Sequence, residues 1–155
     1  MYFETTKSPL GPLTLFAEVN KIISLEFGTM TENRSSPLLK EAISQLKAYF
    51  GGQLKHFNLP LNTSGTDFQK TVWGLVVKIP YGSTRSYGQL SQDLGSAPRA
   101  VGGACGKNPI PIIVPCHRVL SANYKIGGFS GRGGIQTKAS LLHFEGITLD
   151  FKTKA

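Results

Sequence analysis

The stretch SYGQLSQDLGSAPRAVGGACGKN, residues 86–108, predicts two short helices in tandem. Ser86 and Gln89 have the spacing of a capping box, in which the two residues satisfy each other's backbone N–H groups at a helix start. Gly95 can end this first helix. Two helices joined by a glycine-containing turn of about four residues match a helix-turn-helix, although any α-helical hairpin has the same pattern.

The second helix of this pair has an unusual centre. We expect Ser96 as its N-cap, Pro98 in its first turn and an end near Gly106. The adjacent Gly102 and Gly103 each cost about 1 kcal/mol in helix propensity relative to alanine. Such a cost indicates that a neighbouring backbone or a nucleic acid strand comes close to this helix.

Positive charge is concentrated in the same half of the chain. Residues 1–65 hold six Lys and Arg against five Asp and Glu, a net charge of +1, and residues 66–155 hold eleven against four, a net charge of +7. A basic excess suits a polyanion such as nucleic acid. Many soluble proteins are mildly basic without such a partner, so charge alone does not decide between the two.

The N-terminal region predicts short strands followed by one helix. The helix has Ser36 as N-cap, Pro37 at its first position and Gly51 at its end. Its apolar face is expected to hold Leu39, Ala42, Ile43, Leu46 and Phe50. The predicted strands are YFETT, LTLFAEV and IISLEF, rich in aromatic and β-branched residues and separated by turn formers. This order indicates an antiparallel meander with a helix.

A linker is predicted at LPLNTSGT, residues 59–66, where the charge balance also changes. The chain of 155 residues is long enough for one ordinary domain or two small ones. We expect domains at residues 1–64 and 65–155. The second begins with a helix that ends at Pro80 and places Trp73 in the core. Its apolar spacing is given by Phe68, Val72, Leu75, Val76 and Ile79.

The last predicted helix, GGIQTKASLLHFEG, has a carboxylate in an unfavourable place. Ile135, Ala139 and Leu142 share one face, and Gly146 ends the helix. Glu145 in the final turn lies near the negative end of the helix dipole. We therefore expect Glu145 either to face water or to have a cationic or hydrogen-donating partner.

Cys116 lies in the stretch NPIPIIVPCHRVL, residues 108–120, between a proline and a histidine. We expect a buried strand that ends at Pro115, with the thiol where this element meets a turn. An imidazole beside a thiol can assist nucleophilic sulfur chemistry, because the thiolate is the reactive form. Side chains of neighbours in an extended chain point to opposite faces, so Cys116 and His117 can cooperate only if the chain turns or through a water. A buried structural cysteine is the other reading.

Other chemistry has little support in the sequence. With two cysteines, no signal-peptide pattern and no long apolar span, we expect free thiols in a reducing cytoplasm and no membrane segment. Cys105 is expected to be a small packing residue. The cysteines and histidines lack the paired spacing of a zinc site. GRGG at residues 131–134 lacks the dinucleotide fingerprint, so we expect neither metal nor nucleotide or S-adenosylmethionine cofactor.

The chain resembles the O6-alkylguanine-DNA alkyltransferases, also named methylated-DNA-protein-cysteine methyltransferases. The motifs that carry the resemblance are PCHRV, with RAVGGA and IPYGSTRSYGQL before it and GGFSG and LLHFEG after it. The resemblance spans residues 67–146, and KSPLGPLTL extends it loosely into the N-terminal half. It implies an α+β fold. Residues 1–64 would form a ribonuclease H-like α/β roll with an antiparallel sheet, and residues 65–155 a helical, winged-helix-like domain with the helix-turn-helix.

The resemblance also implies a reaction centre. Cys116 would accept the alkyl group, His117 would be its base through a bound water, and Glu145 would orient and polarise the imidazole. Asn108 would brace the loop. Tyr87 would donate a hydrogen bond to guanine N3, so that the base leaves in a neutral form.

Further residues would bind the base and the DNA. Ser130 would contact O6, with Phe129 beside it where a tyrosine is common, and the backbone carbonyls of Cys116 and Val119 would accept from the exocyclic amine. Arg99 would fill the gap left by a flipped nucleotide in double-stranded DNA. The helix would lie in the minor groove through Ser86, Ala100, Gly102, Gly103 and Ala104.

The implied activity is single-turnover DNA repair. The alkylated base, O6-alkylguanine and also O4-alkylthymine, must leave the duplex before the Cys116 thiolate can attack its alkyl carbon. The resulting thioether is a poor leaving group, so each molecule reacts once, as a monomer and without a cofactor. Two alternatives stay open: a DNA-binding regulator or lesion sensor without chemistry, and a Cys-His hydrolase, for which no oxyanion motif is visible.

Overall fold

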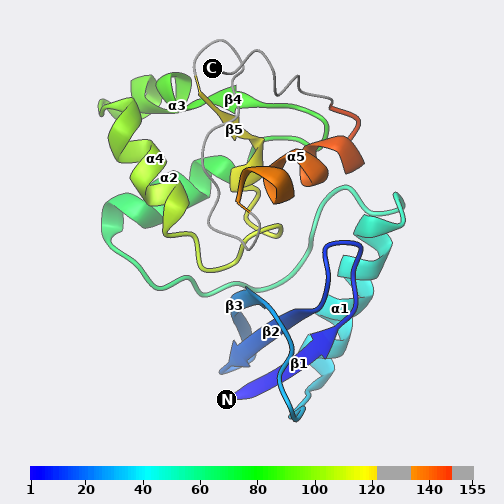
Figure 1. Ribbon diagram of the computed structural model, residues 1–155. Coiled ribbons are helices and arrows are strands. Elements are labelled where there is room, and N and C mark those ends of the chain that lie inside the picture. Colours follow the sequence, from blue (N-terminus) through cyan, green and yellow to red (C-terminus); the bar gives the residue numbers. More distant parts are fainter. Residues whose placement is uncertain (122–133, 148–155) are drawn as a thin grey trace. The chain divides into compact units, whose positions relative to one another are not determined.

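The computed structural model describes residues 1–121 and 134–147. It has a mixed α+β fold, as predicted, and divides into two compact units, Met1–Ser64 and Gly65–Ala155 (Figure 1). No helix in the described part of the chain is long and apolar enough to cross a membrane.

The first unit is a three-stranded antiparallel sheet with one helix. The strands β1 (Tyr2–Thr6), β2 (Leu13–Glu18) and β3 (Lys21–Phe27) pair in the order of the chain, which confirms the predicted meander. The tight connection between β2 and β3 uses Val19 and Asn20, both with positive φ. Such a backbone matches the twist of a hairpin.

Helix α1 (Pro37–Phe50) provides the core partner of this sheet. The Ser36 side chain accepts a hydrogen bond from the backbone N–H of Leu39 at 3.3 Å, so the predicted N-cap is confirmed. Tyr49 is buried, whereas Phe50, which was expected on the buried face, is half-buried and lies edge-on to the ring of Tyr49. The buried face consists of Leu39, Ala42, Ile43, Leu46 and Tyr49.

The second unit contains the predicted helices. They are α2 (Asp67–Val76), α3 (Tyr87–Leu94), α4 (Pro98–Gly106) and α5 (Ile135–Phe144). Trp73 is buried as expected, and its indole N–H donates to the backbone oxygen of Ala104 at 2.9 Å. This bond ties α2 to α4, which lie side by side in Figure 1.

The tandem helices α3 and α4 follow the predicted helix-turn-helix pattern. Ser86 and Gln89 form both bonds of the capping box, at 3.0 and 2.9 Å, and Gly95 takes the left-handed conformation that ends α3. The predicted N-cap at Ser96 is wrong, because Ala97 occupies that position without a side-chain cap. Pro98 follows it and has no N–H to satisfy, which reduces the need for a capping side chain.

The predicted strand before Cys116 is wrong. Residues 111 and 114 form one isolated bridge around a tight turn, and Ile112 has a φ of 76°. The prolines at 109, 111 and 115 have no N–H groups, so a continuous ladder of hydrogen bonds could not form there. A 3-10 turn, η1 (Cys116–Arg118), follows, and β5 (Val119–Leu120) then pairs in parallel with β4 (Arg85–Ser86).

The buried face of α5 also differs from the prediction. Ile135 is 38% exposed and Ala139 only half-buried, whereas Lys138, Leu141 and Leu142 are buried. Helical spacing predicted apolar residues on the buried face. Lys138 is buried there instead, because its amine has a polar partner inside the unit. This partner belongs to the candidate site.

Candidate active site

Asn108 closes the loop that carries Cys116. Its amide group donates to the backbone oxygen of Val114 at 2.9 Å, and its side-chain oxygen accepts from the N–H of Ile110 at 2.9 Å. Asn108 is only 5% exposed, so both bonds are sheltered from water. Ile112, a β-branched residue at positive φ, lies in the same loop, where such strain persists only if surrounding contacts hold it. The loop is therefore a rigid support for the residues after it.

Cys116 and His117 occupy the first two positions of η1, directly after this loop. Because the chain turns there, the two side chains are not forced to opposite faces as they would be in a strand. Both are buried, Cys116 at 4% exposure and His117 at 0%. The turn therefore meets the condition under which a neighbouring imidazole can act on the thiol.

Glu145 follows α5 as its C-cap residue and is buried. Its Oε2 lies 2.7 Å from His117 Nε2, and its Oε1 accepts from the N–H of Gly82 at 3.3 Å. Arg118 donates to both oxygens, from Nε at 2.8 Å and from Nη2 at 3.0 Å. Glu145 was expected to face water or to have a cationic or hydrogen-donating partner. It has two partners, the imidazole of His117 and the guanidinium of Arg118.

The hydrogen bonds assign the protons of His117. An ionised carboxylate can only accept, so Nε2 carries the hydrogen and Nδ1 keeps a free lone pair. Burial lowers the pKa of His117, Glu145 raises it, and Arg118 and Lys138 lower it, with a net decrease that keeps the ring neutral at pH 7. Within the described residues, buried Nδ1 has no hydrogen-bonding partner. His117 therefore has the form of a general base.

The two cysteines of the chain contact each other. A hydrogen bond with Cys105, followed by burial, raises the pKa of Cys116 well above its ordinary value, while Asn108 and Lys138 lower it. Cys105 is buried on α4, in agreement with the predicted packing role, and no disulfide joins the pair. The nucleophile thus rests as a thiol and needs a base, and sequence spacing gave no sign of the sulfur contact.

Lys138 extends a cation toward this site from α5. It is fully buried, its amine donates to the Tyr87 hydroxyl at 3.2 Å, and burial lowers its pKa to about 8. Burial also raises the pKa of Tyr87, so the phenol keeps its proton and can donate it in a hydrogen bond. Sequence reasoning missed Arg118 and Lys138 as site residues, because a basic residue in a basic domain looks like surface charge.

The residues predicted to meet DNA divide into exposed and buried ones. Arg99, Ala100 and Gly103 are exposed on α4, and a side chain at Gly103 would meet no atom within 4 Å. Gly102 is half-buried against the ring of Tyr87. Ala104 is only 3% exposed and faces the interior, so its side chain cannot form part of an outer surface. The Ser86 hydroxyl is engaged in the capping box.

The structure describes one of the three remaining residues that were predicted to bind the base. Val119 is buried in β5, whereas Phe129 and Ser130 lie outside the described residues. No cluster of three or more His, Cys, Asp or Glu in residues 1–121 and 134–147 could hold a metal ion.

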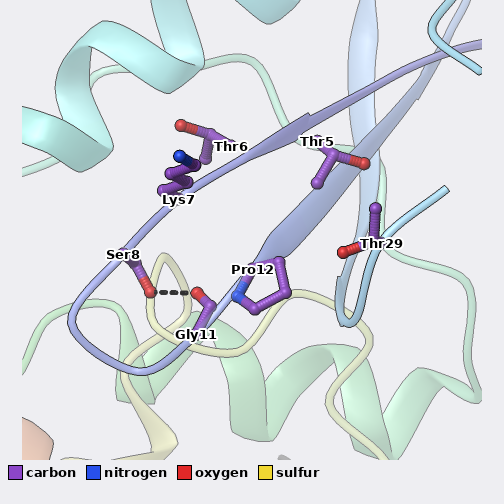
Figure 2. Close-up of a pocket in the computed structure, with 7 residues that line it drawn as sticks. All are labelled: Thr5, Thr6, Lys7, Ser8, Gly11, Pro12 and Thr29. Atoms are coloured by element: carbon purple, nitrogen blue, oxygen red, sulfur yellow. Dashed lines mark hydrogen bonds between the residues drawn. The ribbon is translucent and has the colours of Figure 1, made fainter.

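A separate cavity of about 520 Å³ lies in the first unit, lined by residues 5–8, 11–12 and Thr29 (Figure 2). The Ser8 hydroxyl there donates to the backbone oxygen of Gly11 at 2.6 Å. Lys7 is the sole ionisable residue in the lining of this cavity.

Comparisons with known proteins cover both units. Residues 1–63 match the family described as 6-O-methylguanine DNA methyltransferase, ribonuclease-like domain, and residues 67–147 match its DNA binding domain. The methylated-DNA–protein-cysteine methyltransferase of Mycobacterium tuberculosis is 43% identical over 154 residues, 94% of this chain and 92% of that protein. That of Methanosarcina acetivorans is 41% identical, over 94% of this chain and 99% of that protein.

A solved structure agrees with the sequence matches. The crystal structure of M. tuberculosis OGT in complex with DNA has a TM-score of 0.85 and 44% sequence identity. The match covers 94% of this chain and 92% of that one.

Proposed function

The chain belongs to the O6-methylguanine DNA methyltransferase family, and we propose that it moves the alkyl group of a damaged base irreversibly onto Cys116. It is a methylated-DNA–protein-cysteine methyltransferase that acts in DNA repair. The observation that supports Cys116 as the acceptor is its position in η1, next to a neutral His117 held by Glu145 at 2.7 Å. All three residues belong to the unit with the helix-turn-helix.

The transfer would proceed as an in-line displacement at the alkyl carbon. The free Nδ1 of His117 takes the thiol proton of Cys116 through a bound water, and the sulfur attacks the carbon attached to O6. A carbon–sulfur bond forms while the carbon–oxygen bond breaks and its electron pair moves into the guanine. Tyr87 passes its phenolic proton to N3, so the guanine leaves in a neutral form, and the proton that His117 took from the thiol replaces it on Tyr87 by way of water. The thioether that remains is a poor leaving group, which limits each molecule to one reaction.

DNA would bind through the exposed face of α4. Arg99 and Ala100 are exposed there, and the open space at Gly103 supports close contact with a groove wall. We infer binding in the minor groove, with Arg99 in the gap left by the extruded nucleotide, since a base within a duplex is out of reach of a buried thiol. We expect a cytoplasmic monomer that repairs O4-alkylthymine as well.

Two domains are part of this proposal. Residues 65–155 would carry the reaction centre and the DNA surface, and residues 1–64 would form a domain without a role in the chemistry. The charge supports this division, since the second half has a net charge of +7.

Intact-protein mass spectrometry tests the proposal. The native protein and Cys116→Ala are each incubated with duplex DNA that contains one O6-methylguanine. We expect one added methyl group on the native protein, located on Cys116 by peptide mapping and saturating at one per molecule, and none on the variant. DNA binding without any mass change would identify a lesion sensor or regulator. Repeated turnover without modification of the protein would identify a hydrolase.

A further inference from the structure

We infer that Arg118 is a positioning residue for the methyl transfer: its guanidinium fixes Glu145 and balances its charge, so that His117 can serve as a neutral base. This inference rests on the proposed function of Cys116 and His117. Arg118 acts through Glu145, since its polar contacts are with that carboxylate and a backbone oxygen.

The guanidinium is held on three sides. Nε and Nη2 donate to the two oxygens of Glu145 at 2.8 and 3.0 Å, and Nη1 donates to the backbone oxygen of Ile79 at 2.7 Å. The ring of Tyr81 lies against the same group, 5.8 Å from Cζ to the ring centroid. Arg118 is only 6% exposed. A planar fork with this many partners has one orientation, and the carboxylate that it grips has one as well.

The grip on Glu145 determines the orientation of His117. Oε2 accepts from both Arg118 Nη2 and His117 Nε2, so the carboxylate cannot rotate without breaking one of these bonds. The imidazole is fully buried, and its second nitrogen, Nδ1, keeps the free lone pair. The direction of that lone pair therefore depends on a chain of contacts from Arg118 through Glu145 to the imidazole.

Charge balance is the second part of the role. A buried carboxylate beside an imidazole favours the imidazolium ion, which has no lone pair for a thiol proton. The charged groups that act on His117 are Glu145, Arg118 and Lys138. Arg118 contacts both carboxylate oxygens, and it opposes the effect of Glu145 on the pKa of His117. Without Arg118, His117 should take up a proton at a higher pH.

A purely structural role makes a different prediction. Arg118 also connects η1 to the segment after α2 through Ile79, so its loss could simply destabilise the unit. Such a loss would lower stability and slow the reaction equally at every pH. The titration of His117 separates the two roles, because it reports charge and not folding.

The test compares Arg118→Met, Arg118→Lys and the native protein over about pH 5 to 9, the range in which a histidine titrates. Single-turnover methyl transfer is followed on O6-methylguanine duplex DNA, and the His117 ring nitrogens are followed by 15N NMR. For Arg118→Met we expect transfer at pH 7 to slow by about 100-fold, the scale of general-base catalysis. The acid limb of the pH–rate profile and the His117 titration should both move to higher pH.

Arg118→Lys keeps a point charge without the fork. We expect it to restore most of the His117 titration and only part of the rate. Asp93→Asn, which breaks an exposed arginine–carboxylate pair in the same unit, should keep the native rate and pH profile. An unchanged His117 titration in Arg118→Met, with equal slowing at every pH, would overturn the inference.

A comparison in the Glu145→Gln background covers the case in which Arg118→Met alone does not fold. In a Glu145→Gln background the buried carboxylate charge is gone, so adding Arg118→Met should have little further effect on the rate if Arg118 acts through Glu145. A full additional loss would show an independent role and overturn the inference. Failure of the native protein to accept a methyl group would instead overturn the proposed function, while the His117 titration would still test the role of Arg118.

Discussion

The two units differ in what they bury. Among the described residues, the first unit buries only two polar residues, Thr6 and Thr14, and the hydroxyl of the latter is satisfied by the backbone oxygen of Gly28. The second unit buries Ser91, Asn108, His117, Arg118, Lys138 and Glu145. Buried charges cost folding free energy unless they are paired, so the buried Arg118, Lys138 and Glu145 side chains are expensive to bury without their partners. The core of the first unit is thus almost wholly apolar, whereas the core of the second holds the charged groups of the proposed reaction.

The largest effect should come from removing the buried charge of Glu145. In Glu145→Gln the carboxamide is a weaker partner for His117, and the guanidinium of Arg118 loses its counter-ion. We expect the single-turnover rate to fall by about 100-fold, as for loss of general-base assistance, and the unfolding free energy to decrease as well. Stopped reactions on methylated duplex DNA and urea denaturation measure the two quantities. A native rate would remove Glu145 from the mechanism.

An apolar deletion in the first unit should affect stability alone. Leu39 is fully buried in α1, and Leu39→Ala should lower the unfolding free energy by about 3 kcal/mol through lost burial and a cavity. Below the unfolding transition the rate of methyl transfer should stay at the native value. Urea denaturation and single-turnover assays on the same preparation check this. A rate loss as large as that of Glu145→Gln would show that the first unit also contributes to the chemistry.

The sequence predicted regular elements better than the site for a physical reason. Helix starts depend on neighbours three residues apart, so Ser36 and Ser86 could be identified as caps from local chemistry. The conformation of the segment before Cys116 could not be predicted in this way, because a run of apolar residues occurs both in strands and in buried turns. Its three prolines, which have no N–H groups, favour the turn. The resemblance pointed to Cys116, His117 and Glu145, which the structure brings to one buried cluster with Arg118.

The missed residues share one property. Arg118 and Lys138 are cations that become site residues only through contacts far apart in the chain, 27 and 51 residues from their partners Glu145 and Tyr87. No helical or strand periodicity carries information over that separation. The same holds for the contact between the two thiols. Sequence patterns therefore locate reacting groups more readily than the groups that adjust their charge.

Lys138 should make the stability of the second unit depend on pH. Its pKa falls from 10.5 to about 8 because burial disfavours the ammonium ion. Between these values the unfolded chain binds more protons than the folded one, so this lysine makes the unfolding free energy rise with pH. A fall from 10.5 to about 8, at about 1.4 kcal/mol for each pKa unit, makes this contribution to the unfolding free energy about 3 kcal/mol. Lys138→Met should lack it.

Urea denaturation of the native protein and Lys138→Met at about pH 7 and pH 10 isolates this contribution, because the two proteins share every other titrating group. The variant should gain stability relative to the native protein at pH 7 and lose that advantage at pH 10. Leu39→Ala, which changes no charge, serves as the control and should differ from the native protein by the same amount at both pH values. If Lys138→Met also differed from the native protein by the same amount at both pH values, the amine of Lys138 would not be desolvated.

The smallest effect should come from Asp93→Asn, which replaces a carboxylate by a carboxamide, as Glu145→Gln does, but at the surface. Arg85 Nη1 and Asp93 Oδ2 are 2.8 Å apart, the distance that also separates Arg118 Nε from Glu145 Oε1. The exposed pair has side chains 37% and 48% accessible to water, which screens its attraction. Asp93→Asn should therefore cost at most about 0.5 kcal/mol, shrinking further in high salt, with no change in transfer rate. Urea denaturation at low and high salt measures this cost. If Asp93→Asn destabilised the protein as much as Glu145→Gln, distance and not burial would set the strength of these pairs.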